Sequence, residues 1–298
     1  MTVSIFDSGL LYGEFAFEMT RTFHHRPFQL RRHLERLQGS LDFLQIDSGL
    51  TLDELERLTL ETLARNLPTE SDEVDWHIPH DISRGPAELF STVFPEGMRP
   101  TVIISCWTLL KAMGRFAPNY ERGVPVILSA QKSIPPDLID PRAKTRSRVH
   151  FQLAQLHAAK VAPGSWPVLT DEAGFLTEGP SWNVFIVKDG TLISPAGEEI
   201  LHGVSREITL RAAHVAGIPT REEGITPAGA READEILCTA TSFGIVHASS
   251  FEGKLMGDGH PGPILRRLFP TWKQEVGLDF IAQARRYAEL LPAWEAAE

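Results

Sequence analysis

The apolar positions between residues 28 and 66 repeat with the period of an α-helix. Five leucines recur there at intervals of three and four residues: Leu30, Leu34, Leu37, Leu41 and Leu44. This stripe predicts one amphipathic helix over residues 28–44, and a second leucine run predicts another over residues 52–66. Strands are expected at residues 15–23, 75–83 and 101–108. The first part of the chain is therefore an α+β unit.

The apolar pattern breaks between residues 109 and 123, where charged residues, Gly and Pro interrupt it. We interpret residues 1–110 as a small N-terminal α+β domain, 111–123 as an interdomain linker and 124–298 as a larger C-terminal domain. In the C-terminal domain the pattern predicts strands at 124–128, 166–170, 183–188, 191–194 and 235–239. It predicts helices at 145–160, 205–216, 262–269 and 278–290.

Composition excludes several classes of protein. The 298 residues are 42% hydrophobic and 23% charged with a net charge of −10, so non-specific binding to nucleic acid or to anionic membranes is not expected. No window approaches ~18 apolar residues, and the N-terminus lacks the basic and apolar regions of a signal peptide. We expect a cytoplasmic protein in which Cys106 and Cys238, both within apolar runs, are buried thiols.

A group of polar residues near position 80 resembles a metal-binding set. It contains His77, His80 and Asp81. On a strand, alternate side chains share a face, so His77 and Asp81 lie on one side and His80 on the other. This alternation separates the three ligands, and we expect no metal site.

The residues that point to chemistry begin at Glu178, a carboxylate at a tight Glu-Gly turn just before a strand. A loop then leads through Gly203 into a helix that starts near Ser205. A helix N-terminus preceded by glycine is suited to bind an anion. A carboxylate can hold a protonated ring nitrogen, so this pairing suits pyridoxal phosphate, which carries a ring nitrogen at one end and a phosphate at the other.

Three further residues have functional interpretations beside ordinary ones. Lys144 precedes a helical segment, and a Schiff-base lysine must be partly desolvated, whereas most lysines are solvated surface residues. Arg36 lies on the charged side of the first helix, which is exposed by default but can clamp a phosphate. Thr241 follows a strand, where turn capping is the simpler account. Individually, each of these residues favours its ordinary interpretation.

Taken in order, the motifs resemble a known family. They are Phe6-Asp7-Ser8-Gly9, Phe17-Glu18, His33-Leu34-Glu35-Arg36-Leu37, Lys144, Glu178-Gly179 with Asn183-Val184-Phe185, Leu201-His202-Gly203-Val204-Ser205-Arg206, and Ala233-Asp234-Glu235-Ile236 before Thr241. Over residues 3–270 the chain is similar to the class IV (fold type IV) pyridoxal-phosphate-dependent aminotransferases. This group contains branched-chain, D-amino-acid and R-selective amine aminotransferases, with aminodeoxychorismate lyase as a relative.

The resemblance implies a role for each matching position. Lys144 is the Schiff-base lysine and proton shuttle, Glu178 pairs with the pyridinium nitrogen, and Phe17 lies beside the substrate. Arg36, the amides of Val204 and Ser205, and Thr241 hold the phosphate. The implied fold is a small α+β domain plus a larger cofactor-binding domain with a β-barrel-like core. The implied protein is a homodimer that moves an amino group from an amino acid or amine to a 2-oxo acid by a ping-pong mechanism.

Some positions depart from the family pattern. The chain begins almost at the Phe6-Asp7 motif, and Pro180 replaces the usual small residue after Gly179. His77 stands in the strand where branched-chain enzymes carry an arginine, and we include it in the substrate pocket. The asparagine that often follows the lysine is absent. If residues 144–148 are helical, Arg148 lies one turn beyond Lys144, where we hypothesise that it holds a substrate carboxylate or the cofactor hydroxyl.

Two alternatives to an aminotransferase remain at this point. One is a lyase of the aminodeoxychorismate type, which would release pyruvate without an amino acceptor. Glu18 after Phe17 and the Glu-Gly turn favour transamination over this lyase. The other is a protein that binds the cofactor without catalysis, suggested by the altered sequence after Lys144 and the missing carboxylate-binding arginines.

Overall fold

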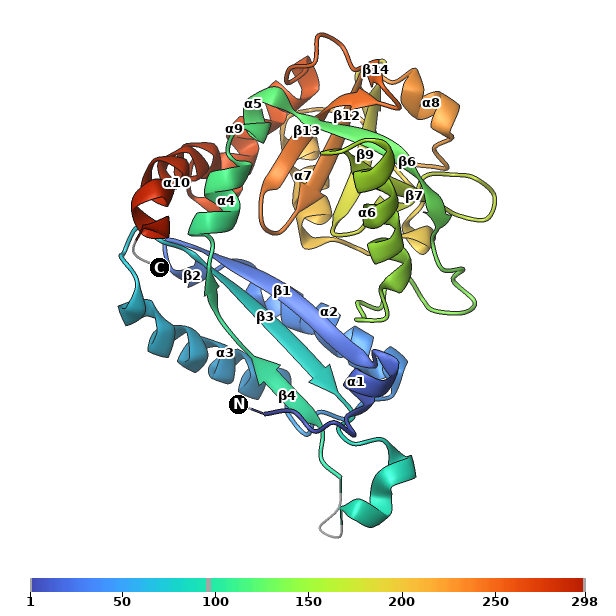
Figure 1. The fold of residues 1–298 in the computed structure, drawn as a ribbon. Coiled ribbons are helices and arrows are strands. Elements are labelled where there is room, and N and C mark those ends of the chain that lie inside the picture. Colours follow the sequence, from blue (N-terminus) through green and yellow to red (C-terminus); the bar gives the residue numbers. More distant parts are fainter. Residues whose placement is uncertain (1, 95–97, 297–298) are drawn as a thin grey trace. The chain divides into compact units, whose positions relative to one another are not determined.

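The computed structural model describes residues 2–94 and 98–296 (Figure 1). The chain forms two compact units. The first comprises the residues up to Thr108 together with Arg142–Arg148. The second comprises Leu109–Pro141 and the residues from Val149 onward. The segment that contains Lys144 therefore belongs to the first unit, although 33 residues of the second unit, Leu109–Pro141, precede it in the sequence.

The first unit is an antiparallel sheet with two long helices. Its strands are β1 (Phe15–Phe23), β2 (Arg26–Pro27), β3 (Trp76–Ser83), β4 (Thr101–Ile104) and β5 (Trp107–Thr108). They follow the order β2-β1-β3-β4, with β5 also paired to β3. The helices are α1 (Ser8–Tyr12), α2 (Leu30–Leu44) and α3 (Leu52–Asn66), with 3-10 turns at Leu67–Thr69 and Glu88–Val93. The predicted helices at 28–44 and 52–66 and the predicted strand at 15–23 are confirmed.

The core of the first unit is built on the leucine stripe of α2. Leu34, Leu37 and Leu41 are fully buried and pack with Leu55 of α3 and Ile82 of β3. The stripe forms because these leucines share one face of the helix, and burying that face removes apolar surface from water. The Arg36 side chain of the same helix is only 10% exposed, so the expectation that it lies on an exposed charged face is wrong.

The second unit is built on a nine-stranded sheet of the described residues, in the order β11-β10-β9-β12-β13-β6-β7 with β8 on β9 and β14 on β13. The strands are β6 (Val124–Lys132), β7 (Trp166–Thr170), β8 (Glu178–Gly179), β9 (Trp182–Lys188), β10 (Thr191–Ser194), β11 (Thr220–Glu222), β12 (Glu235–Ala240), β13 (Gly244–Phe251) and β14 (Lys254–Leu255). The helices are α4 (Leu110–Phe116), α5 (Asn119–Arg122), α6 (Val149–Val161), α7 (Val204–Val215), α8 (Pro227–Arg231), α9 (Pro263–Val276) and α10 (Phe280–Glu295), with a 3-10 turn at Gly197–Glu199.

Three segments of the second unit differ from the pattern expected of them. Residues 111–123, interpreted as a linker, contain α4 and α5, and Gly114 of α4 lies so close to Tyr287 of α10 that an added Cβ would approach its backbone within 2.9 Å. Helix α9 continues through Pro270 to Val276, because the buried Trp272 anchors its second half and donates from Nε1 to Thr209 Oγ1 at 3.1 Å. Helix α6 starts at Val149 rather than at residue 145. Among the described residues no helix is long and apolar enough to cross a membrane.

Candidate active site

The segment around Lys144 is extended and pairs with the edge of β1. The N–H of Phe17 donates to the Lys144 carbonyl, and the N–H of Arg146 donates to the Phe15 carbonyl, both at 2.9 Å. Ala16 and Thr145 form an isolated antiparallel bridge between these two bonds. The prediction that a helix begins at residue 145 is therefore wrong, because pairing with a distant strand satisfies the backbone groups that a helix would otherwise use.

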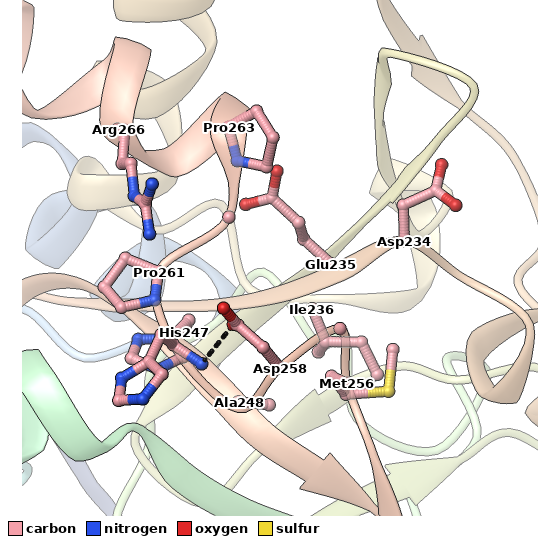
Figure 2. Close-up of a pocket in the computed structure, with 13 residues that line it drawn as sticks. Asp234, Glu235, Ile236, His247, Ala248, Met256, Asp258, Pro261, Pro263 and Arg266 are labelled. Carbon is pink, nitrogen blue, oxygen red and sulfur yellow. Dashed lines mark hydrogen bonds between the residues drawn. The ribbon is translucent and has the colours of Figure 1, made fainter.

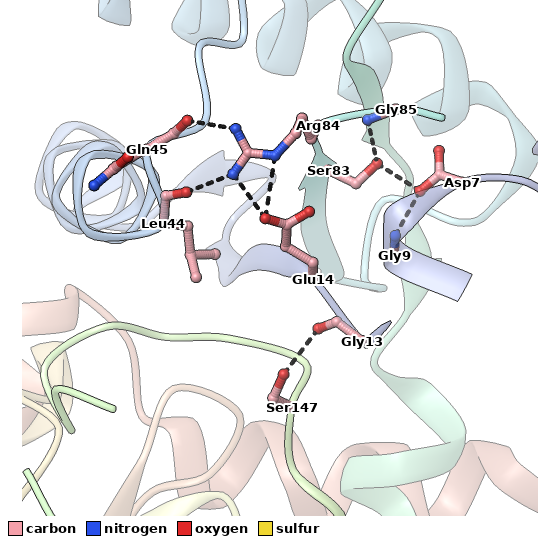
Figure 3. Close-up of polar contacts among 10 residues, drawn as sticks. All are labelled: Asp7, Gly9, Gly13, Glu14, Leu44, Gln45, Ser83, Arg84, Gly85 and Ser147. Carbon is pink, nitrogen blue, oxygen red and sulfur yellow. Dashed lines mark hydrogen bonds and ion pairs between the residues drawn. The ribbon is translucent and has the colours of Figure 1, made fainter. Parts of the chain in front are cut away.

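Contacts on both sides hold the Lys144 segment in place. The N–H of Lys144 donates to Ser40 Oγ at 2.9 Å, and Ser40 Oγ donates to the Arg36 carbonyl at 3.0 Å. The hydroxyl of Ser147 donates to the Gly13 carbonyl at 3.1 Å (Figure 3). The lysine backbone is thus tied to α2 and to the loop before β1, which fixes where its side chain starts.

The loop before β1 is itself anchored by a buried carboxylate. Asp7 accepts hydrogen bonds from the N–H of Gly9 at 2.8 Å and from Ser83 Oγ at 2.7 Å (Figure 3). It also accepts from Thr101 Oγ1 at 2.6 Å. Since Asp7 is fully buried, these bonds offset the cost of removing its charge from water. They join the N-terminal motif to β3 and β4.

The side chain of Lys144 lies over an aromatic ring. Its Nζ is 4.5 Å from the centroid of Phe17, whose side chain is only 6% exposed. The guanidinium carbons of Arg146 and Arg148 lie 3.8 and 5.4 Å from the same centroid. Residues 144–148 are not helical, so the helical reason for pairing Arg148 with Lys144 is wrong, although both side chains reach the Phe17 ring.

Arg36 is held by a buried carboxylate. Its Nε donates to Glu18 Oε2 at 2.8 Å and its Nη2 donates to Glu18 Oε1 at 2.7 Å. His33 Nδ1 lies 3.1 Å from Glu18 Oε1. This geometry fixes the orientation of a guanidinium, a group that has five N–H donors and suits phosphate.

In the second unit, Glu178 is joined to the loop before α7. Glu178 and Asn183 are register partners in β8 and β9. The Nδ2 of Asn183 donates to the Leu201 carbonyl at 2.9 Å and to Glu178 Oε2 at 3.4 Å, and the N–H of Leu201 donates to Glu178 Oε1 at 3.4 Å. Asn183 thus connects the carboxylate to the segment that leads into Gly203.

Gly203 allows a close approach at the start of α7. A Cβ at this position would lie 2.0 Å from Asn183 Oδ1. The first intrahelical bond of the helix runs from Glu207 N–H to the Gly203 carbonyl at 2.9 Å. The N–H groups of Val204 and Ser205 precede that bond and have no acceptor within the helix, which suits an anion.

A buried hydroxyl lies near this helix start in the sheet. Thr239 of β12 is the register partner of Asn183, is 1% exposed, and its Oγ1 has no hydrogen-bond partner within the structure. Thr241 lies two residues further on, in the turn between β12 and β13. Buried hydroxyls are usually hydrogen-bonded, so the Thr239 hydroxyl is suited to meet a bound group.

The two histidines of β3, His77 and His80, are buried in the first unit. His77 is 8% exposed, its Nδ1 accepts from Trp107 Nε1 at 3.0 Å, and burial lowers its pKa to about 3. Thr59 Oγ1 lies 2.8 Å from His80 Nε2. Asp81 pairs with Arg146 Nε at 2.6 Å. Among the residues that the structure describes, no group of three or more His, Cys, Asp or Glu could hold a metal ion.

A cavity of about 390 Å³ lies elsewhere in the second unit, at the start of α9 (Figure 2). None of the residues predicted to hold cofactor or substrate lines it. Its most buried carboxylate, Glu235, accepts from the N–H groups of Ile264 at 2.7 Å and Leu265 at 3.1 Å. Glu235 therefore caps α9, a structural role that explains a charge at this position.

Two residues with clear roles in the geometry had no role from the sequence. Ser40 is 1% exposed and supports the Lys144 backbone. Its signal in the sequence is a small polar residue one turn after Arg36. Asn183 was recognised as part of a motif, but its contact with the Leu201 carbonyl joins segments that only the fold brings together.

The comparison with protein families decides the family. The model of amino-transferase class IV matches residues 16–251. The chain belongs to this family. Its relatives include a Methanocaldococcus jannaschii protein assigned as a branched-chain-amino-acid aminotransferase, 31% identical over 272 residues and covering 91% of this chain and 90% of the relative. They also include D-alanine aminotransferase of Staphylococcus epidermidis, 26% identical over 268 residues and covering 89% of each chain.

The fold agrees with this membership. The crystal structure of the Escherichia coli branched-chain amino acid aminotransferase has a TM-score of 0.76 and 25% identity, covering 90% of this chain and 87% of that one. The protein is a class IV aminotransferase with the fold type IV, and the predicted fold class is confirmed. Enzymes of this family depend on pyridoxal phosphate.

The chemistry of the donor set fits this cofactor. The second unit offers the Glu178 carboxylate, the N–H groups at the start of α7, which follow Gly203, and the Thr239 hydroxyl, which has no hydrogen-bond partner. The first unit offers Lys144 over an aromatic ring and a fixed arginine, Arg36. These are the groups that an aldehyde, a ring nitrogen and a phosphate require.

Proposed function

We propose that this aminotransferase takes its amino group from an α-amino acid, passes it to a 2-oxo acid, and binds pyridoxal phosphate through Lys144. The observation that carries the proposal is the fixed backbone of Lys144, whose N–H is bound by Ser40 and whose carbonyl is bound by Phe17. A lysine that forms a covalent bond and moves a proton needs a backbone held in a fixed position, so that its amine reaches the reacting atoms.

We assign the remaining cofactor contacts by family resemblance. Arg36, the amides of Val204 and Ser205, and Thr241 hold the phosphate, and Glu178 faces the ring nitrogen. The arrangement in each unit, taken separately, supports these roles. The N–H donors of Asn183 and Leu201 orient the Glu178 carboxylate, and Glu18 orients Arg36.

Each residue then has a definite task in the reaction. The cofactor, when bound, supplies an aldehyde that reacts with amines and a ring that withdraws electrons. Lys144 Nζ would take the proton from the substrate Cα and deliver it to C4′ of the cofactor. Glu178 keeps a proton on the ring nitrogen by its negative charge. The face of Phe17 supports the Lys144 side chain and excludes water from one side of Nζ.

The visible absorption spectrum of the purified protein tests the proposal. We expect a cofactor band that is bleached by an L- or D-amino acid and restored by a 2-oxo acid, with one product formed before the second substrate binds. Lys144→Ala removes the band and the activity, whereas Lys160→Ala, at an exposed position of α6, keeps both. A band that no donor bleaches, or a band that persists in Lys144→Ala, would refute the proposal.

We also propose that the protein is a cytoplasmic homodimer. Helix α1 exposes Leu10, Leu11 and Tyr12 at 66%, 43% and 64%, which favours a further apolar contact with a second copy. Cys106 and Cys238 are free thiols, as is usual in a reducing compartment. Light scattering of the holoprotein tests the dimer, and a monomeric mass at micromolar concentration would contradict it.

A further inference from the structure

The first turn of α7 lies between two anchored side chains of the second unit. Before the helix, His202 Nε2 lies 2.8 Å from the Gly197 carbonyl oxygen. Within the first turn, Arg206 Nε donates to Ser194 Oγ at 2.9 Å. Residues 203–205 therefore lie between two side chains that are both tied to the end of β10 and the turn that follows it.

Arg206 is a buried cation with a fixed orientation. It is 4% exposed, and its Nη2 lies 3.0 Å from Glu222 Oε2 of β11. Nη2 has no hydrogen bond within the described residues, so its contact with Glu222 is an ion pair by distance alone. Together with the Ser194 bond, this ion pair holds the guanidinium against β10 and β11, which are neighbours in the sheet.

The position of Arg206 in the helix is unfavourable for a cation. Arg206 is the third residue of α7, which begins at Val204. The N–H groups of a first turn carry partial positive charge, so a cation there opposes helix formation and an anion favours it. The charge of Arg206 therefore does not stabilise the helix directly. What its side chain provides is a link from the first turn to the sheet.

This link fixes the N–H groups that directly precede Arg206. Those of Val204 and Ser205 have no acceptor within the helix, since the first intrahelical bond starts at Glu207. Their direction depends on the turn in which they lie, and Arg206 fixes the end of that turn. A turn that is already fixed loses less entropy when it binds an anion than a free one does.

We infer that Arg206 is a positioning residue for phosphate binding. It holds the first turn of α7 so that the N–H groups of Val204 and Ser205 can bind a phosphate monoester, and it acts through the backbone. This inference rests on the proposed function, since it explains how the proposed phosphate site is held.

The first experiment measures the affinity of the cofactor-free protein for pyridoxal phosphate and for pyridoxal, which lacks the phosphate. We expect Arg206→Gln to weaken pyridoxal phosphate binding about 10- to 100-fold, the scale of one lost hydrogen bond to a charged group, with pyridoxal binding unchanged. Arg211→Gln is the matched control, because Arg211 lies in the same helix, is 50% exposed and pairs with Glu275 at 3.0 Å. Equal losses for the two ligands, or no loss for pyridoxal phosphate, would overturn the inference.

The second experiment keeps the buried cation in place. Ser194→Ala removes the acceptor of Arg206 Nε and leaves a side chain of similar size. Calorimetry with inorganic phosphate should show an affinity about 5- to 10-fold lower in this variant. Arg206→Lys, which keeps the charge, should bind phosphate more tightly than Arg206→Gln. Unchanged phosphate affinity in Ser194→Ala would overturn the inference.

The results separate this inference from the proposed function. If the wild type transaminates and the variants bind phosphate as tightly as the wild type, the inference alone fails. If the variants bind phosphate more weakly but no donor bleaches the cofactor band of the wild type, the proposed function fails and the role of Arg206 stands.

Discussion

Arg36 donates two hydrogen bonds, at 2.7 and 2.8 Å, to Glu18, a carboxylate that is completely buried. Burial raises the pKa of Glu18, but Arg36 and His33 lower it more, so the pKa lies well below its ordinary value of 4.5. Glu18 is therefore ionised in the folded protein. Its charge fixes the guanidinium that we assign to the cofactor phosphate.

Replacing Glu18 by Gln should destabilise the protein strongly. The guanidinium of Arg36 is 10% exposed and would lose its buried counter-charge, which costs about 3 kcal/mol of unfolding free energy. Urea unfolding at pH 7 measures this loss. The control is Glu61→Gln, because the exposed Arg57–Glu61 pair at 2.6 Å contributes less than about 0.5 kcal/mol. Equal losses in the two variants would contradict the assigned role of burial.

The same pair predicts a pH dependence. The pKa of Glu18 is lower in the folded protein than in the unfolded one, so its contribution to stability is present above pH 4.5 and is lost as the pH falls further. Below this pH, the free energy of unfolding of the wild type should fall more steeply with decreasing pH than that of Glu18→Gln. The difference between the two slopes corresponds to at most one proton taken up on unfolding. Urea unfolding at several acidic pH values gives both slopes, and equal slopes would rule out Glu18 as the source.

A second carboxylate should matter for turnover rather than for stability. Glu178→Gln removes the negative charge proposed to keep the ring nitrogen protonated, while the amide oxygen can still accept from one of the two N–H groups of Asn183 and Leu201 that bind the carboxylate. We expect the cofactor to remain bound and kcat to fall about 100-fold, as when one stabilising group is removed from an active site. Glu198→Gln, at an exposed position of the same unit, is the control. Full activity in Glu178→Gln would remove Glu178 from the mechanism.

Two glycines should respond oppositely to replacement by alanine. In Gly203→Ala the new Cβ would meet Asn183 Oδ1 at 2.0 Å, so Asn183 must move, at a cost of about 1–3 kcal/mol and weaker cofactor binding. Gly39 lies in the middle of α2 with nothing within 4 Å of an added Cβ. Gly39→Ala should stabilise by about 0.5–1 kcal/mol. Thermal unfolding and cofactor titration measure both, and a neutral Gly203→Ala would contradict the close approach.

The sequence predicted elements best where periodicity was local. The leucine stripe of α2 identified that helix because its apolar period depends on neighbouring residues alone. The segment after Lys144 was wrongly expected to be helical, because its partner strand β1 lies about 130 residues earlier in the sequence. A helix would place Arg148 on the same face as Lys144, whereas the extended backbone places Arg146 there.

The residues of the candidate site that lie in short sequence motifs were predictable, whereas the residues that support them were not. Glu178 and Gly203 belong to short motifs with recognisable chemistry, so the sequence alone pointed to them. The supports of the site were not predictable: Ser40 reaches Lys144, and Asp81 reaches Arg146, across separations of 104 and 65 residues. Such contacts depend on tertiary packing, which no local pattern encodes.

The buried hydroxyl of Thr239 provides a separate test of where the phosphate binds. Its Oγ1 has no partner within the protein, so Thr239→Val removes an unsatisfied polar group while keeping the shape of the side chain. Without cofactor, the variant should be more stable than wild type by about 1 kcal/mol. The variant should also bind pyridoxal phosphate about 5- to 10-fold more weakly, since a hydrogen bond to a charged group is lost.

Thermal unfolding of the apoprotein and fluorescence titration with cofactor measure the two effects. A gain in stability with unchanged cofactor affinity would show that the hydroxyl serves neither the phosphate nor the fold, and Thr241→Val would then be the variant expected to weaken binding.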